Sequence, residues 1–445
     1  MTRRAARGLL IGAALALALA GGRAGADPGG SDSLDTYLRA LADSTDRYFG
    51  ISAAEVDTAG LDSALVYRLA HPHLERRGGG PRFGPWFSFD RAEGALWGGT
   101  AGWGSAGRAG EISARLGDAA GPNAWRGGAG YRKTWGARRG TSPRWNFEAT
   151  GGRFAGVLDP DRGASFLRVL RALGDGSDRQ HYSLREGVRV AVEREAPAWR
   201  AGLALRDQIE LPLSTTTTWN LLRRPPEVIF NQPAVRGRAR ELRAEAAMRL
   251  PFLPFHMEGA FAASAEALGS DFDYDRMRLI LGGEVPLAGV AAAVPQLEYG
   301  RLTGTALPQA SFFLGGHNSL RSLPAEELGG TVKALARLDV FFIPDLLALA
   351  HLPHPTALPI QGALFAAAGA VSGHDPYGGA GAASNAWPAR AAWRSEVGGG
   401  LLYRPGFPDP RSSLRANWAW PLGPGAGVRV SLEYAAPLDL LRILK

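Results

Sequence analysis

The sequence contains no cysteine among its 445 residues. This excludes disulfide bonds, thiolate metal sites, thiol catalysis and a lipid anchor attached to an N-terminal cysteine. Lysine is rare as well, at positions Lys133, Lys333 and Lys445 only, so the formal net charge of +8 comes almost entirely from arginine. Because the arginines are spread along the chain instead of clustering on one segment, we expect no nucleic acid as a partner.

Long apolar runs are also missing. The longest, from Leu9 to Ala20, is about a dozen residues, short of the ~20 that a membrane-spanning helix needs. Three arginines precede it and an Ala-Gly-Ala triplet follows, which is the pattern of an export signal, so we interpret residues 1–26 as a signal peptide cleaved before Asp27. Export without a spanning helix leaves a periplasmic protein, a released protein or a membrane β-barrel.

Alternation of apolar and polar residues favours the barrel. In GVRVSLEYAAPL, Val428, Val430 and Leu432 alternate with Arg429 and Glu433, the two-residue period of a strand with one apolar and one polar face. Similar segments recur, many of them about ten residues long, with charged residues at their centres and aromatic residues near their ends. We therefore predict an all-β fold, a transmembrane antiparallel β-barrel, over residues 81–445.

The alternation predicts about sixteen strands. They are expected at 85–91, 94–103, 111–117, 124–135, 144–152, 185–194, 200–211, 216–222 or its neighbour 237–250, 254–266, 275–286, 292–302, 331–342, 360–371, 394–404, 412–421 and 427–437. The first two could also be one bent strand. Long connections, at 153–184, 212–236, 303–330 and 372–393, alternate with short ones, as outer loops alternate with periplasmic turns in membrane barrels.

Residues 27–80 have a different pattern. Leu34, Leu38 and Leu41 fall at helical spacing, which predicts an amphipathic helix, and a shorter helix is expected around 61–69. With only about fifty residues, this stretch is interpreted as a short helical N-terminal extension in the periplasm or as a plug of the barrel lumen.

Four segments carry a family resemblance. They are FSFDRAEGALWGG at 87–99, LGSDFDYDRMRL, EYGRLTGTALPQASFFLGGHNSLRS and SEVGGGLLYRPGFPDPRSSLRANWAWPL. In this order they resemble the opening strand, middle strands, lumen loop and closing strands of the BamA and TamA family of outer-membrane proteins, also called bacterial surface antigens. The resemblance extends from about Trp86 to Leu438. It implies that 303–330 is the sixth outer loop and 360–371 the thirteenth strand.

The resemblance also implies a lumen-loop motif. In the family, an aliphatic residue is followed by Arg-Gly-aromatic on a loop folded back into the barrel. The corresponding residues here are Leu320, Arg321, Ser322 and Leu323, and a glycine pair, Gly315 and Gly316, precedes them in the same loop. Only the first two positions of the motif, Leu320 and Arg321, match the family.

The strand that faces this motif departs from the family as well. The family pattern is Phe-x-Asp-x-Gly, and this chain has Phe365, Ala367 and Gly369. Because Ala367 stands where the family has its Asp, the usual ion pair with Arg321 cannot form. A buried guanidinium group must then find other acceptors, such as loop carbonyls or lumen acids.

The resemblance implies a non-enzymatic outer-membrane barrel that inserts, assembles or translocates proteins, with its N-terminus in the periplasm. Expected partners are outer-membrane lipid, lipopolysaccharide and client outer-membrane proteins, and the barrel is expected to be monomeric. Two features depart from family assembly factors: residues 27–80 are too short for one periplasmic βαα repeat, and the final residues lack the usual terminal aromatic.

Two alternatives remain at this point. One is a passive pore or surface antigen that keeps the barrel and lacks assembly activity. The other, more remote, is a hydrolase similar to the outer-membrane phospholipase, because His317 and Ser319 are two residues apart. No orienting third group is identifiable for that pair, so we expect no enzymatic activity. No cofactor or metal is expected. No glycine pair is followed by Lys-Ser or Lys-Thr, and no carboxylate cluster lies near the histidine pairs His71 with His73 and His351 with His354.

Overall fold

The computed structural model describes residues 80–445 except 106–109, 137–142, 160–171, 174–179, 197, 223–230, 251–252, 288–289, 317–318, 353–359, 404–412, 424–426 and 436–445. The chain divides into two units, residues 1–80 and 81–445. Everything below concerns the second unit. The predicted signal peptide and helical extension lie, apart from Gly80, outside the described residues.

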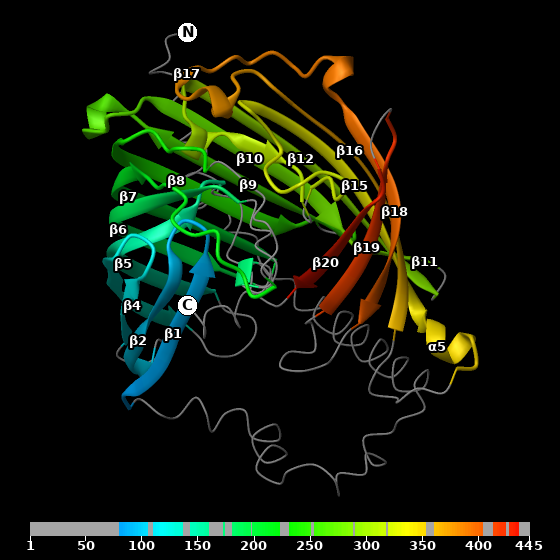
Figure 1. The fold of residues 1–445 in the computed structure, drawn as a ribbon, viewed down its shortest axis with the longest axis horizontal. Helices are drawn as coiled ribbons and strands as arrows, with labels where there is room; N and C mark the ends of the chain where they lie inside the picture. The colour runs from blue at the N-terminus through cyan, green and yellow to red at the C-terminus, as the bar shows by residue number, and fades with distance from the viewer. Residues whose placement is uncertain are drawn as a thin grey trace, which may run out of the picture. The chain divides into compact units, whose positions relative to one another are not determined.

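Long strands follow one another as an antiparallel meander, each paired with the next (Figure 1). Their bounds are β1 Arg82–Asp90, β2 Gly94–Ser105, β3 Gly110–Ala119, β4 Ala124–Gly136, β5 Arg144–Val157, β6 Tyr182–Glu195, β7 Trp199–Pro212, β8 Gly237–Arg249, β9 Phe255–Ser264, β10 Tyr274–Gly283, β12 Ala291–Ala306, β15 Val332–Asp345, β16 Ile360–Ser372, β18 Arg394–Tyr403, β19 Ser413–Pro421 and β20 Arg429–Ala435.

Four short strands and several short helical turns accompany the long strands within the described ranges. β11 (Val285–Leu287) and β17 (Gly381–Ala382) each pair with part of β12, whereas β13 (Phe312–Leu314) and β14 (Leu328–Gly330) pair with each other in a separate sheet. The described helices are α5 (Leu346–Leu349) and the 3-10 turns η2 (Glu266–Leu268), η3 (Pro308–Ala310), η4 (Pro376–Gly378) and η5 (Arg390–Ala392). No helix in the described part of the chain is long and apolar enough to cross a membrane.

The all-β prediction is confirmed. The large sheet has 18 strands, of which β11 and β17 are short, so sixteen long strands remain. Within them β12 is the eleventh and β16 the thirteenth, as predicted, and β1 and β2 are two antiparallel strands, not one bent strand. The segment 216–222 is not a strand; β8 takes that place. Its backbone bonds elsewhere, because the Thr216 N–H donates to the Arg91 carbonyl in the β1–β2 turn at 2.9 Å.

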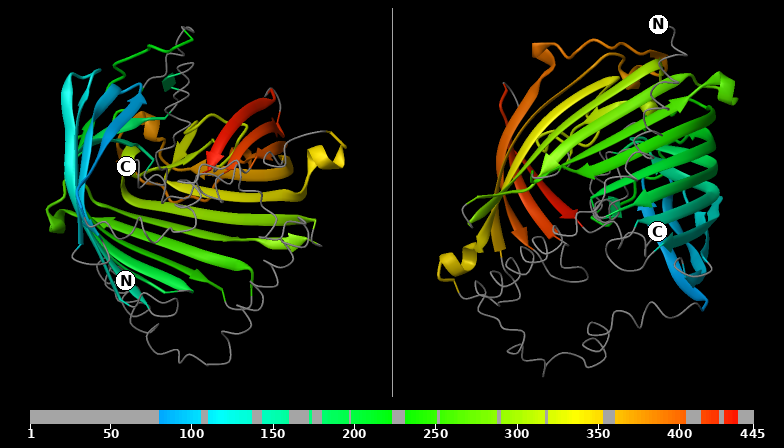
Figure 2. Two further views of the ribbon diagram at one scale, coloured as in Figure 1. Left: turned by 90° about the horizontal axis from the view of Figure 1, so that it is seen from below. Right: turned by 180° about the vertical axis from the view of Figure 1, so that it is seen from behind.

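The two faces of the sheet differ in chemistry. Apolar side chains such as Val188, Leu205 and Leu364 are exposed on the outer face, whereas intervening charged residues such as Arg206 and Asp339 lie on the inner face. The sheet curves so that this charged face is concave (Figure 2). This pattern is typical of membrane barrel strands, whose outer face contacts lipid. Among the described residues no ladder joins β1 to β20.

Candidate functional site

The connection between β12 and β15, residues 307–331, is buried against the inner face of the sheet, and we call it the lumen loop. Phe312 and Leu320 are both 0% exposed. Leu320 packs with Leu314, Leu335 and Ala367, so the loop contacts side chains of both β15 and β16. Burying these apolar groups stabilises the loop in the lumen by roughly 1.5 to 3 kcal/mol per large side chain.

A tight turn in this loop presents Arg321. The Gly316 N–H donates to the carbonyl oxygens of Leu320 and Leu323 at 2.9 and 3.0 Å. Gly315 has φ +112°, and a Cβ atom added there would lie 1.9 Å from the Pro324 carbonyl oxygen, so only glycine fits. Its N–H donates to the Ser319 hydroxyl at 3.2 Å.

Both the side chain and the backbone of Arg321 are held by the wall. Arg321 is 3% exposed, its Nη2 lies 2.9 Å from Asp339 Oδ1 on β15, and its Cζ lies 4.4 Å from the centre of the Phe365 ring on β16. Glu396 on β18 accepts the N–H groups of Arg321 and Ser322 at 2.8 and 2.6 Å. Two carboxylates therefore fix this turn, each through charge-assisted hydrogen bonds.

Asp339 accepts two further guanidinium groups. Arg337 Nη2 lies 2.9 Å from its Oδ2, and Arg415 Nη1, from β19, lies 2.8 Å from its Oδ1. We call Arg321, Arg337, Asp339 and Arg415 the Asp339 cluster. Gly398 on the intervening β18 leaves space for the Phe365 ring, because a Cβ atom there would lie 2.2 Å from Phe365 Cζ.

The carboxylate that pairs with Arg321 lies on β15, whereas the family resemblance implies one on β16, at the position of Ala367. Ala367 packs on Leu320 instead of pairing with Arg321, as the sequence requires. Asp339 supplies the charge from β15, where it stands opposite Phe365 of β16. A carboxylate one strand away therefore reaches the same guanidinium group.

The remaining residues of the predicted motif lie around this site. Leu323 packs, half-buried, on the Leu320 cluster. Gly369 lies close to the same cluster, because a Cβ atom there would be 3.0 Å from Leu335 Cδ1. Ser319 is 1% exposed, and its hydrogen-bond contact is with the loop backbone. The hydrolase alternative pairs Ser319 with His317, and His317 lies outside the described residues.

Sequence reasoning missed Asp339, Glu396 and Arg415. Alternation in β15, β18 and β19 indicates that each belongs to the polar face, and that signal was present in the sequence. It does not indicate which of the polar residues meet, because Asp339 and Arg415 are separated by the two strands β16 and β18.

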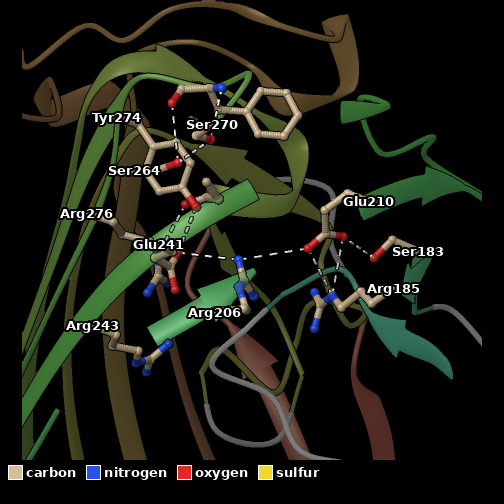
Figure 3. Close-up of polar contacts among 12 residues, drawn as sticks. Ser183, Arg185, Arg206, Glu210, Glu241, Arg243, Ser264, Ser270, Tyr274 and Arg276 are labelled. Atoms are coloured by element: carbon tan, nitrogen blue, oxygen red, sulfur yellow. Dashed lines mark hydrogen bonds and ion pairs between the residues drawn. The ribbon is translucent and has the colours of Figure 1, made fainter. Parts of the chain in front are cut away.

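A second polar network continues along β7, β8 and β10 (Figure 3). Arg206 Nη2 lies 3.4 Å from Glu241 and 3.8 Å from Glu210, and the Tyr274 hydroxyl donates to Glu241 at 2.7 Å. Beyond Tyr274, Arg276 Nε donates to the carbonyl oxygen of Ala310 in the lumen loop at 3.0 Å. The lumen loop is therefore attached to the β10 side of the wall as well as to β15 and β18.

The outer connections meet one another at His181. The backbone N–H of His181 donates to the Glu326 carboxylate of the lumen loop at 2.9 Å. Its ring Nδ1 accepts the backbone N–H of Gln232 at 3.0 Å. Arg91 Nη2 lies 3.3 Å from the same Nδ1, and the Tyr377 ring contacts the imidazole edge to face at 5.5 Å. We call these five residues the outer-loop junction.

The His181 imidazole is held neutral in this junction. Burial, and then the charge of Arg91, lower the pKa of His181 from 6.5 to about 4. An unprotonated Nδ1 is what the two donors require, so protonation would disrupt the contact that joins the connections. Among the described residues no group of three or more His, Asp or Glu is arranged to hold a metal ion.

Comparison with known proteins gives structural neighbours only. No family model and no curated protein matches the sequence. BamA from Haemophilus ducreyi lacking POTRA domains 1–3 aligns at 11% identity over 80% of this chain and 70% of that one, with a TM-score of 0.49. CdiB from Acinetobacter baumannii aligns at 11% identity over 80% of this chain and 58% of that one, with a TM-score of 0.40. CdiB from Escherichia coli aligns at 10% identity over 80% and 62%, with a TM-score of 0.42. None of these TM-scores reaches 0.5, so function is inferred from this chain's own residues.

Proposed function

We propose that this protein is a non-enzymatic outer-membrane β-barrel that inserts or translocates other polypeptides, with the lumen loop as an internal brace. The observation that carries the proposal is the attachment of Arg321 to two carboxylates on separate strands, Asp339 at 2.9 Å and Glu396 at 2.8 Å. The loop is held across β15, β16 and β18 by these buried groups, so this part of the wall would stay intact while another part opens.

The ends of the sheet are where such a wall would open. Within the described part of the chain, β19 and β20 comprise 9 and 7 residues and β1 comprises 9, against 14 for each of β5, β6 and β7. Shorter ladders have fewer hydrogen bonds to break, and an exposed strand edge pairs readily with an incoming strand. In this proposal β1 and β20 form the seam, a client strand adds to it, and the periplasmic end receives the client.

Engineered cysteines test the seam, since the natural chain has none. Pairs scanned along β1 and β20, from Phe87 and Val430 outward, would be oxidised in the full-length protein reconstituted in vesicles. A matched control pair at Ala149 and Val190 stands directly opposite in the β5–β6 ladder. We expect a seam disulfide, but not the control, to stop insertion of an unfolded barrel client. Undiminished insertion with the seam locked would refute the proposal.

A passive pore is the second candidate, and one observation favours it. Arg132, Glu148 and Arg189 on the inner face are 36%, 35% and 39% exposed, which is the solvation expected of a water-filled lumen. Planar-bilayer conductance distinguishes the two, measured with and without residues 27–80 and with Arg321→Ala. Large steady conductance in all forms, together with unchanged outer-membrane protein levels on depletion, would favour the pore.

A further inference from the structure

The segment 381–395, which runs from β17 to the first residues of β18, lies along the loop end of the sheet (orange in Figure 1). β17 pairs with the end of β12, and the Ser372 hydroxyl on β16 donates to the Ala386 carbonyl oxygen at 2.6 Å. Outward positions here are covered: Ala334 is 5% exposed and Ala370 0%, whereas Leu338 and Leu364, further along the same faces, are 42% and 53% exposed.

Aromatic rings mark this segment. Trp387 is 62% exposed and stacks on Tyr299 of β12, with 6.0 Å between the ring centres. The ring centre of Trp393 lies 6.5 Å from that of Trp387. Tyr299 follows the exposed Leu297 on the outer face and precedes Arg301, so it stands where the apolar band ends. Tryptophan and tyrosine at that level are typical of the boundary between lipid tails and headgroups.

Exposed arginines without carboxylate partners surround these rings. Arg301 Nε donates to the neutral Asn385 amide at 3.0 Å, and Arg394 Nη1 donates to the Ala391 carbonyl oxygen at 2.9 Å. Arg390, in η5, is exposed, and no acidic residue occurs in 376–395. Within the described residues none of the three has an ion-pair partner; the nearest outward acid by register is Asp275, opposite Thr303.

Several arginines elsewhere on the loop end are paired with carboxylates. Arg238 and Arg240 of β8 lie 2.7 and 3.1 Å from Asp207, and Arg153 lies 3.4 Å from Glu186. The surface around segment 381–395 therefore combines an excess of positive charge with an aromatic boundary. A phosphate group matches the guanidinium fork, and a lipid tail beside it matches the exposed Trp387.

We propose that Tyr299, Arg301, Trp387, Arg390, Trp393 and Arg394, the outer-face patch, bind the phosphate-bearing headgroup of an anionic lipid in the outer leaflet. This inference rests on the proposed membrane location. The bound lipid would hold segment 381–395 against β12 and β16, next to the strands that carry the Asp339 cluster.

Native mass spectrometry of the full-length protein in detergent, titrated with a diphosphorylated glycolipid, tests the patch. We expect Arg390→Ala/Arg394→Ala to weaken binding about 30-fold, because each arginine near an anionic lipid surface contributes about fivefold. Arg153→Ala/Arg238→Ala is the matched control, since it removes exposed but paired arginines and should leave binding unchanged. Arg390→Lys/Arg394→Lys should retain most of the affinity.

Three results would overturn the site: equal losses in both double variants, equal binding of a zwitterionic lipid, or displacement by inorganic phosphate at matched concentration, which would assign the contacts to a free anion. Heat-modifiable gel migration checks that each variant is folded. Failure of the wild-type protein to enter bilayers would refute the proposed membrane location, whereas entry without lipid selectivity would refute the patch alone.

Discussion

Replacing Asp339 by alanine should release the lumen loop. The carboxylate contacts Arg321 from the loop, Arg337 from its own strand and Arg415 from β19, at 2.8 to 2.9 Å. Its side chain is 6% exposed, and those of Arg321, Arg337 and Arg415 are 3%, 9% and 7% exposed. Without Asp339 these guanidinium groups remain buried near one another with their shared carboxylate gone.

The magnitude follows from that burial. Removing one partner of a buried ion pair costs about 3 to 5 kcal/mol, mostly because the remaining charge is left uncompensated. We place Asp339→Ala at the upper end of that range, since several cations depend on one carboxylate. Asp207→Ala is the matched control: this carboxylate also contacts two arginines, but its side chain is 28% exposed, so the loss should stay below about 1 kcal/mol.

The free energy of unfolding can be measured by urea titration in lipid vesicles, with heat-modifiable migration as the readout of folded barrel. Limited proteolysis would report the lumen loop separately, and we expect cleavage within 307–331 in Asp339→Ala only. Adding Ala367→Asp to this variant returns a carboxylate to the inner face of β16, opposite Arg337, and should recover part of the loss.

Equal destabilisation by Asp339→Ala and Asp207→Ala would refute the reasoning, because burial would then have no effect on the cost. Unchanged protease resistance of the loop in Asp339→Ala would show that apolar packing alone holds it.

Three further predictions follow from the same geometry. The folded-state pKa of His181 lies below its unfolded value, so the outer-loop junction should be fully stable above pH 6.5 and lose roughly 3 kcal/mol of stability as pH falls to about 4. Hydrogen exchange of the Gln232 backbone N–H should report this change, and the variant His181→Phe should abolish the pH dependence. Gly315→Ala forces a side chain into φ +112° and against the Pro324 carbonyl oxygen, so we expect a loss of about 2 to 3 kcal/mol in urea titration, whereas Gly378→Ala, with open space around it, should be near neutral. Glu396→Leu removes the acceptor of the Arg321 and Ser322 N–H groups, and we expect about 1 to 3 kcal/mol per stranded donor and faster proteolysis of the loop, an expectation that wild-type protease resistance would contradict.

The strands were predictable because their determinant is local. A barrel strand must alternate between two environments, so Val188 and Arg189 report the strand's two faces without knowledge of any neighbour. Of the two alternatives for the eighth strand, 237–250 is confirmed as β8. The other, 216–222, has a run of threonines with high strand propensity, yet its backbone bonds to the β1–β2 turn instead of to a ladder. Tertiary contacts decided that segment.

Alternation by itself determined the all-β class and the positions of about sixteen strands, since it depends on nearby residues alone. The family resemblance of the sequence favoured the count of sixteen and identified the loop that contains Arg321. The sequence also excluded Ala367 as an ion-pair partner. Only the tertiary structure decided that Asp339 and Glu396 take over that role and that Arg415 joins them. These contacts span strands far apart in the chain, and the curvature of the sheet, together with the missing side chain at Gly398, sets which charges come within bonding distance.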